Sequence, residues 1–233
     1  MQEPAAPVVL ITRPEAAARR FAAQVEALGL RHVIAPLLRI VGVPHDTAAV
    51  RDANGLVFTS ENGVRFAGPG RGRPAWCVGP RTAEQARKAG YDVREGPGDA
   101  ARLIPLIDDL GPGWLHPHGA HVAARLPAPG MVVYDQLPLP PSPEALALLQ
   151  GTAPVILPLF SPRSARLAAE AARGSPGAPL RIVPISAAAE AAWRVAWPEG
   201  AVRSVVADQP DAQGILRAIR AVTDTEREPF SAG

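Results

Sequence analysis

The side chains best suited to bind an anion follow short apolar runs in the sequence. The run 56–58 ends in Thr59 and Ser60, and the run 155–160 ends in Ser161. This pattern is typical of a buried parallel strand whose carboxyl end opens into a loop and a helix. Ligands of α/β sheets bind at that end, where hydroxyls, amides and helix N-termini present donors to carboxylates or phosphates. The residues at predicted strand ends are Thr12, Arg13, Thr59, Ser60, Asn62, Thr82, His118, Ser161 and Ser186.

Three histidines have the spacing H-x-H-x-x-H. Strand alternation would place His116 and His118 on one face, with His121 beyond them. However, no cysteine or acid lies nearby in the sequence, and Pro117 and Gly119 imply a turning backbone. We therefore expect no metal site and assign His118 as a hydrogen-bond donor that lines the binding site.

Motifs of nucleophilic catalysis and of nucleotide binding are absent from the sequence. The glycine-rich segment 68–74 resembles a phosphate loop, but it precedes a strand instead of joining a strand to a helix. For Arg13, two readings stay open: a solvated side chain, or a cation held at a strand end to meet an anionic ligand. The residues alone therefore indicate binding of a small anion and no particular reaction.

Composition excludes several classes of protein. The 233 residues are 47% hydrophobic and carry a formal net charge of +2, without a basic block that would indicate nucleic-acid binding. Cys77 is the one cysteine, so an intramolecular disulfide is impossible and a reduced core residue is expected. We see no signal peptide and no apolar run of the length of a membrane span, and we expect a cytoplasmic protein.

Apolar runs alternate with segments of helical periodicity along the chain. Predicted strands cover residues 8–11, 32–43, 56–58, 75–78, 91–94, 114–116, 131–134, 155–160, 180–185 and 202–207. Predicted helices lie between them, among them 61–67, 99–110, a short one ending near residue 126, 144–150 and 211–222, and residues 226–233 read as a frayed tail. The alternation predicts an α/β fold with mostly parallel sheets.

The two halves of the chain repeat this plan. Ser60 corresponds to Ser161, Gly79 to Ser186 and Asp99 to Asp211, with an offset that increases slowly. Loop insertions in a duplicated domain would produce such an offset, although any two α/β units share some likeness. Duplication predicts a discontinuous domain of residues 1–36 and 138–233, and an inserted domain of residues 37–137. The linkers would lie near 36–44 and 132–143, which are extended and rich in proline, with a cleft between the domains.

An ordered series of short motifs resembles the uroporphyrinogen-III synthase family, in its proteobacterial form. No single motif is specific, but their order and spacing cover about residues 8–222. The motifs are Ile11-Thr12-Arg13-Pro14, Phe58-Thr59-Ser60-Glu61-Asn62-Gly63-Val64, Val78-Gly79-Pro80-Arg81-Thr82-Ala83, the Gly119 turn, Val132-Val133-Tyr134 and Leu159-Phe160-Ser161-Pro162-Arg163-Ser164.

The resemblance implies two flavodoxin-like α/β domains joined by a two-stranded linker. It implies an enzyme of tetrapyrrole biosynthesis that cyclises hydroxymethylbilane to uroporphyrinogen III, with inversion of ring D and loss of water. No metal or organic cofactor is expected. The expected partner is this small substrate, and binding to nucleic acid or a membrane is not expected. The protein is expected to be a monomer that makes at most transient contacts with neighbouring pathway enzymes.

The resemblance also implies roles for single residues. Tyr134 matches the family's tyrosine at the second linker and becomes the candidate general acid; its alternative role is packing between domains. Thr82 matches a cleft threonine that would donate to a carboxylate; alternatively it caps its own helix. Gly119 marks a turn at the substrate site. One departure is that Ser186 and three alanines replace a second Gly-Pro-x-Thr turn, which puts a two-threonine mechanism in doubt.

A rival hypothesis is a non-catalytic two-lobed protein that binds a tetrapyrrole or another polyacid and derives from the same family. The missing threonine turn and the lack of a strong catalytic group motivate it. A response-regulator-like module fits less well, because Thr12 and Arg13 stand where an acidic pocket would be needed.

Overall fold

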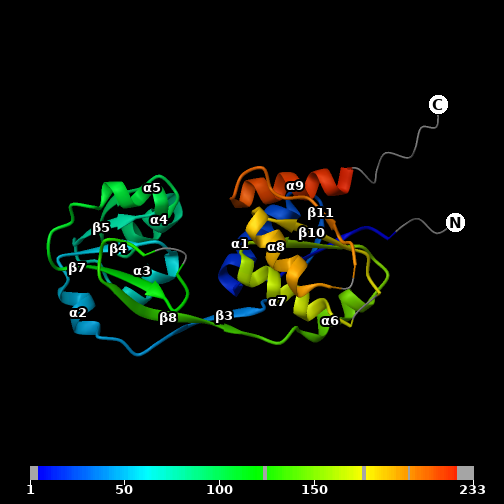
Figure 1. The fold of residues 1–233 in the computed structure, drawn as a ribbon, viewed down its shortest axis with the longest axis horizontal. Helices are drawn as coiled ribbons and strands as arrows, with labels where there is room; N and C mark the ends of the chain where they lie inside the picture. Colours follow the sequence, from blue (N-terminus) through cyan, green and yellow to red (C-terminus); the bar gives the residue numbers. More distant parts are fainter. Residues whose placement is uncertain (1–4, 123–124, 175–176, 199, 225–233) are drawn as a thin grey trace. The chain divides into compact units, whose positions relative to one another are not determined.

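The computed structural model describes residues 5–122, 125–174, 177–198 and 200–224, and its elements are labelled in Figure 1. The chain divides into two compact units. Unit 1 comprises Met1–Arg39 and Pro138–Gly233, and unit 2 comprises Ile40–Leu137. The sequence predicted the first division three residues earlier, after residue 36, and the second at the same place, after residue 137. The two chain crossings are hydrogen-bonded to each other, since the Leu139 amide donates to the Leu37 carbonyl.

Unit 1 contains, over its described residues, a five-stranded sheet in the order β11-β10-β9-β1-β2. Each neighbouring pair of its strands is parallel. Two apolar clusters cover the sheet, which accounts for the continuous apolar runs of β1 and β9. The strands are β1 (Val8–Ile11), β2 (Arg31–Ile34), β9 (Val155–Leu159), β10 (Leu180–Pro184) and β11 (Arg203–Ser204), and the helices are α1 (Glu15–Glu26), α6 (Pro143–Gln150), α7 (Pro162–Ala172), α8 (Ala187–Ala196) and α9 (Ala212–Asp224).

Unit 2 contains, again over described residues, a six-stranded sheet in the order β3-β8-β7-β4-β5-β6. Strand β4 is fully buried between two apolar clusters, and Cys77 of β5 is a buried free thiol, as predicted. The strands are β3 (Leu38–Gly42), β4 (Gly55–Phe58), β5 (Pro74–Cys77), β6 (Asp92–Glu95), β7 (Trp114–Gly119) and β8 (Gly130–Pro138). The helices are α2 (Thr47–Asp52), α3 (Glu61–Ala67), α4 (Pro80–Lys88) and α5 (Ala100–Leu103), followed by the 3-10 turn η1 (Ile104–Leu106).

The two sheets share one strand order. Counted from the edges formed by β11 and β6, strands β10, β9, β1 and β2 take the places of β5, β4, β7 and β8. The predicted residue pairs occupy equivalent positions at helix N-termini: Ser60 and Ser161 cap α3 and α7, and Gly79 and Ser186 precede α4 and α8. Likewise, Asp99 accepts from the Arg102 amide and Asp211 from the Gly214 amide. The duplicated plan inferred from the sequence thus corresponds to a shared topology.

Several predicted elements differ from the structure. The strand predicted over 32–43 is two strands, β2 and β3, and the strands predicted over 114–116 and 131–134 are longer, as β7 and β8. The backbone expected to turn at Pro117 and Gly119 stays in β7. The helix predicted over 99–110 ends at Leu103 and tightens into η1, because Pro105 lacks the amide that would continue an α-helix. No helix is present in residues 120–122 or 125–126, where a short one was predicted. That connection, residues 120–129, is shorter than the dozen or so residues that a helical crossover needs. The strand predicted over 202–207 shrinks to Arg203–Ser204 at a sheet edge. The predicted tail, 226–233, lies outside the described residues.

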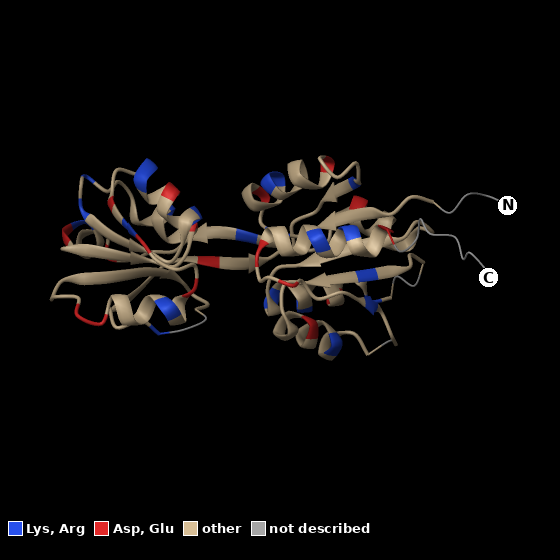
Figure 2. Ribbon diagram, turned by 90° about the horizontal axis from the view of Figure 1, so that it is seen from above, with Lys and Arg blue, Asp and Glu red and all other residues tan. Residues whose placement is uncertain are grey.

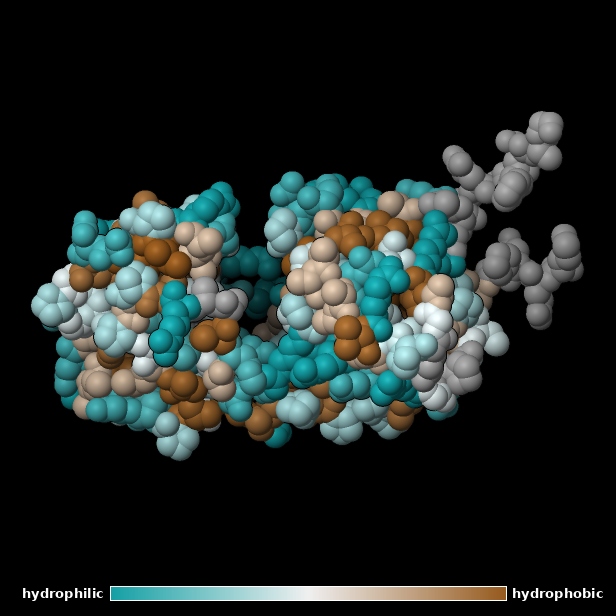
Figure 3. All heavy atoms as spheres, viewed as in Figure 1, coloured by the Kyte–Doolittle hydropathy of each residue, from teal (hydrophilic) through white to brown (hydrophobic). Residues whose placement is uncertain are grey.

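The surface carries charges of both signs and scattered apolar side chains. Basic and acidic residues are interspersed over both units in Figure 2, which agrees with the small net charge. Hydrophobic residues form small groups among hydrophilic ones on the face shown in Figure 3. Over the described residues, no helix combines the length and apolar character that crossing a bilayer requires. The most exposed large hydrophobics among them are Leu106, Val122, Val132, Leu137, Val195 and Val206.

Candidate active site

The carboxyl edge of the unit 2 sheet is formed where β4 ends and α3 begins. Ser60 has an extended backbone, and its hydroxyl oxygen accepts a 3.1 Å hydrogen bond from the Asn62 amide. This N-cap satisfies one of the free amides of the first helical turn. Because the bond uses an oxygen lone pair, the Ser60 hydroxyl proton still has to find an acceptor. Thr59, Ser60 and Asn62 are all half-buried, which suits contact with a ligand.

Thr59 lies beside His116, because β4 and β7 are neighbouring parallel strands. Its Oγ1 is 3.0 Å from His116 Nε2. The imidazole is buried, and burial together with the neighbouring His118 lowers the pKa of His116 to about 4. The ring is therefore neutral at physiological pH, with one N–H donor and one bare nitrogen. The Thr59 hydroxyl thus has a fixed, uncharged partner at the strand end.

His118 and Gly119 end β7, next to β8. Because a carbonyl can only accept, the 2.7 Å contact between His118 Nδ1 and the Gly119 carbonyl makes Nδ1 the protonated nitrogen. Neutral His118 then offers only its Nε2 lone pair to a ligand. It could act as the donor predicted from the sequence only when protonated. His116, His118 and the segment 125–130 line a cavity of about 640 Å³ in unit 2.

Tyr134 is buried on β8, opposite Gly119. Its ring stacks on Phe66, with 5.9 Å between centroids. A Cβ at Gly119 would lie 2.6 Å from the ring and 3.1 Å from the hydroxyl oxygen of Tyr134. The glycine therefore provides the space that the ring occupies, and its bare backbone borders the phenol. The ring thus packs on Phe66 inside unit 2, which is a different contact from the packing between domains considered from the sequence.

Thr82 is 5% exposed in the first turn of α4. The N-cap of that helix is Gly79, so the alternative in which Thr82 caps its own helix does not hold. The Cβ of any other residue at position 79 would lie 2.9 Å from the Gly98 Cα, so glycine keeps two chain segments in close approach here. Thr82 is therefore a buried hydroxyl residue in the first turn of α4 that does not cap the helix.

The carboxyl edge of the unit 1 sheet brings together the ends of β1, β9 and β10. Ser161 accepts from the Ser164 amide at 3.1 Å, and its hydroxyl donates to Ser164 Oγ at 3.0 Å. Its proton is thus engaged within its own helix cap. Ser186 accepts from the Ala189 amide at 3.3 Å. The guanidinium of Arg13 lies 3.8 Å from the centroid of the Phe160 ring, which holds this cation at the strand ends beside Ser161.

Each edge therefore presents hydroxyls and helix N-termini, and unit 1 adds a guanidinium. Such groups bind carboxylates and orient a flexible polyacid. Within the described ranges, no group of three or more His, Cys, Asp or Glu is placed to hold a metal ion. Sequence reasoning missed His116 and Ser164 as partners of Thr59 and Ser161. The i, i+3 spacing of Ser161 and Ser164 could have revealed the second pair, but nothing local places His116 against Thr59.

The sequence profile described as uroporphyrinogen-III synthase HemD matches residues 19–217, which is most of the chain. The chain belongs to this family. No curated protein sequence matches it. Family membership gives the chain the activity of a uroporphyrinogen-III synthase and a function in tetrapyrrole biosynthesis.

Two solved structures are similar to this chain at low sequence identity. The crystal structure of uroporphyrinogen-III synthetase from Helicobacter pylori 26695 is similar to this chain with a TM-score of 0.61 and 13% identity, over 93% of this chain and 99% of that one. A mutant uroporphyrinogen III synthase from the extremely thermophilic bacterium Thermus thermophilus aligns over 96% of this chain and 100% of its own, at 17% identity and a TM-score of 0.49. At such identities the first likeness establishes the fold, and the profile match carries the family assignment.

Within the HemD-family fold, the residues named from the sequence fall into two groups. Thr59, Ser60, Asn62, Thr82, His118, Gly119 and Tyr134 lie at the carboxyl edge of the unit 2 sheet, whereas Arg13, Ser161 and Ser186 lie at that of unit 1. Both groups occupy the edge at which open α/β sheets bind ligands.

Proposed function

We propose that the protein closes hydroxymethylbilane to uroporphyrinogen III, with inversion of ring D and loss of water. The observation that carries this proposal is the family match over residues 19–217. The donor-lined edges support it, because the substrate bears eight carboxylates and each edge offers hydroxyls and helix N-termini to such groups. The proposed reaction uses no metal or organic cofactor.

The proposed catalysis is mainly positioning. Departure of the terminal hydroxyl as water leaves an azafulvene cation. Ring D attacks it through its substituted carbon to give a spiro intermediate, which rearranges and loses a proton. Holding several carboxylates at once fixes the chain in the geometry of that attack and removes much of its entropic barrier. Thr59, Ser60, Asn62, Thr82 and Ser186 are the proposed carboxylate donors, and Arg13 the proposed cation.

A weak acid near the leaving hydroxyl assists the first step. We assign this role to Tyr134, whose phenol borders the bare backbone of Gly119. Ser161 takes a lesser part, since its proton is engaged by Ser164. We further propose that the protein acts as a monomer in the cytoplasm and makes transient contacts with neighbouring pathway enzymes.

The isomer of the product tests the function. The purified full chain, supplied with freshly made hydroxymethylbilane, is expected to yield the type III isomer, whereas heat-inactivated protein yields the spontaneous type I isomer. Separation of the oxidised products by chromatography measures the ratio. Type I product alone would refute the proposal, and tight binding of the substrate under those conditions would favour the polyacid-binding alternative.

We expect Tyr134→Phe to slow turnover several-fold or more while the fold persists, because the ring and its stacking on Phe66 remain and only the acid is lost. Tyr91 is the other tyrosine of the chain and provides a matched control. Its hydroxyl donates to the Gly68 carbonyl at 3.0 Å, so Tyr91→Phe should cost about 1 kcal/mol of stability and leave turnover intact. Unchanged kinetics in Tyr134→Phe would remove Tyr134 from the mechanism.

A further inference from the structure

His116 is a buried polar side chain that the proposed mechanism does not use. It is 3% exposed, yet it lies at the ligand-binding edge of the sheet. Its Nε2 lies 3.0 Å from the Thr59 hydroxyl oxygen, and its ring centroid is 4.9 Å from that of His118. Burying an imidazole costs free energy unless its nitrogens find partners. The contact with Thr59 is therefore a buried contact of the folded protein, and His116 is not a solvated side chain.

The direction of this hydrogen bond decides what Thr59 can do. A hydroxyl has one proton and two lone pairs. If Thr59 donates to a bare Nε2, its proton points into the protein and only lone pairs face a ligand, which repel a carboxylate. If Nε2–H donates to Thr59, the hydroxyl proton is free to be donated outward. Since the ring is neutral, only one of its two nitrogens carries a proton. The direction of the hydrogen bond depends on whether that nitrogen is Nε2.

We propose that His116 is a positioning residue whose Nε2–H donates to Thr59 and so turns the Thr59 hydroxyl proton toward a carboxylate of the substrate. In this tautomer Nδ1 carries no proton, and His116 is one of the residues that line the cavity described above. The neighbouring His118 is protonated on its opposite nitrogen, Nδ1, by its bond to the Gly119 carbonyl. This inference rests on the proposed function, because it names how one substrate contact of that site is prepared.

Kinetics of two His116 variants test the positioning. His116→Leu removes the group that orients the Thr59 hydroxyl, with little loss of volume. The Michaelis constant for hydroxymethylbilane is expected to rise about fivefold, the effect of one lost hydrogen bond between neutral groups. The turnover number should change less than the Michaelis constant. His116→Gln places an amide N–H near the former Nε2 and should restore most of the loss. His45, whose Nδ1 contacts the Val43 carbonyl outside the proposed site, provides the control: His45→Leu should leave both constants unchanged.

Two further experiments distinguish a positioning role of His116 from a packing role: a double variant with Thr59, and a determination of the His116 tautomer. Thr59→Val should raise the Michaelis constant at least as much as His116→Leu, because it also removes the donor to the carboxylate. The double variant should be no worse than Thr59→Val alone. Histidine ring nitrogen NMR of the wild-type chain should show His116 protonated on Nε2 and bare on Nδ1. Additive losses, an unchanged Michaelis constant in His116→Leu, or protonation on Nδ1 would overturn the proposal.

Failure of this inference differs from failure of the proposed function. A wild-type chain that makes the type III isomer upholds the function, whatever His116 does. A wild-type chain that makes only the type I isomer defeats the function and, with it, the assignment of a substrate carboxylate to Thr59. The NMR measurement needs no turnover, so it tests the hydrogen-bond direction in either case.

Discussion

Replacing Gly119 by alanine is expected to lower turnover at least as much as Tyr134→Phe does, since a misplacement of about 1 Å can cost on the order of 100-fold. The new Cβ would lie 2.6 Å from Cε2 and 2.7 Å from Cζ of Tyr134, well inside contact distance. The ring cannot move aside easily, since it is buried and stacks on Phe66. Overpacking of this kind also costs about 1–3 kcal/mol of stability. Turnover of hydroxymethylbilane and urea unfolding measure the two effects.

A double variant shows whether the loss acts through the tyrosine. In a Tyr134→Ala background the ring is absent, so Gly119→Ala should add almost no further loss of activity or stability. Gly111→Ala is the matched control, because no atom lies within 4 Å of its added Cβ and its backbone is not left-handed. An alanine at position 119 that leaves turnover intact would show that the position of the Tyr134 ring does not matter to the reaction.

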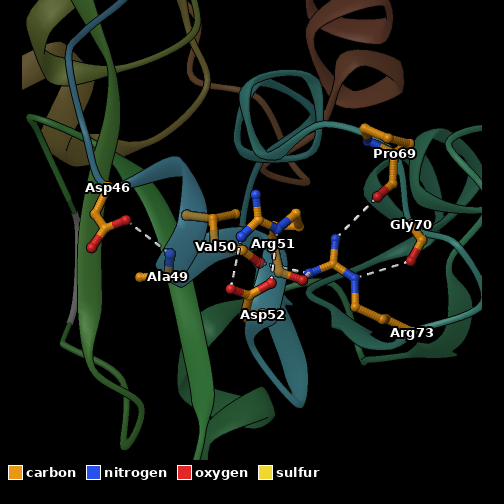
Figure 4. A network of polar contacts seen from close by, with 8 residues as sticks. All are labelled: Asp46, Ala49, Val50, Arg51, Asp52, Pro69, Gly70 and Arg73. Carbon is orange, nitrogen blue, oxygen red and sulfur yellow. Dashed lines mark hydrogen bonds and ion pairs between the residues drawn. The ribbon is translucent and has the colours of Figure 1, made fainter.

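Replacing Arg73 by methionine is expected to destabilise unit 2 by about 3 kcal/mol, because it leaves several carbonyls without a donor. Figure 4 shows the guanidinium between the end of α2 and the loop after α3. Nη1 donates to the carbonyls of Val50 and Arg51, at 2.6 and 2.8 Å, which α2 itself cannot satisfy at its C-terminus. Nε and Nη2 donate to the carbonyls of Gly70 and Pro69, both at 3.0 Å.

The matched control is the neighbouring arginine of the same network. Arg51 pairs with Asp52 at 2.8 Å, but both side chains are more than half exposed, so Arg51→Met should change stability far less than Arg73→Met. Arg73→Lys should recover only part of the loss, since an ammonium offers three donors and cannot fork. Urea unfolding is best followed with Trp193 and Trp197 replaced by Phe, which leaves Trp76 and Trp114 as reporters within unit 2. Equal effects of the two methionine variants would contradict this role of Arg73.

Arg73 also explains why the glycine-rich segment 68–74 is no phosphate loop. A phosphate loop turns backbone amides toward the anion, whereas this loop turns the carbonyls of Pro69 and Gly70 toward a cation of the same chain. Sequence reasoning rejected the phosphate site because of the order of elements. The structure gives a second reason, in the sign of the charge that the loop surrounds.

Much of the fold could be predicted because its signals are local. Strand β1 and helix α3 have the predicted bounds. Ser161 was predicted at a strand end, and there its hydroxyl oxygen accepts from the Ser164 amide. The wrong extents at residues 99–110 and 120–126 arose where apolar periodicity competed with a proline or with a short connection.

The sequence by itself determined the alternation of strands and helices, the polar residues at the strand ends and, through ordered motifs, the resemblance to the HemD family. Caps, turns and periodicity depend on residues a few positions apart, so the chain displays them directly. Only the tertiary structure decided which strand ends are neighbours. The contact of Thr59 with His116 spans 57 residues and that of Arg73 with Val50 spans 23. In the structure, Thr59 of the stretch 56–64 therefore lies beside a buried, neutral histidine. This contact depends on the order of the strands in the sheet and on burial, and residues close in the sequence determine neither of these.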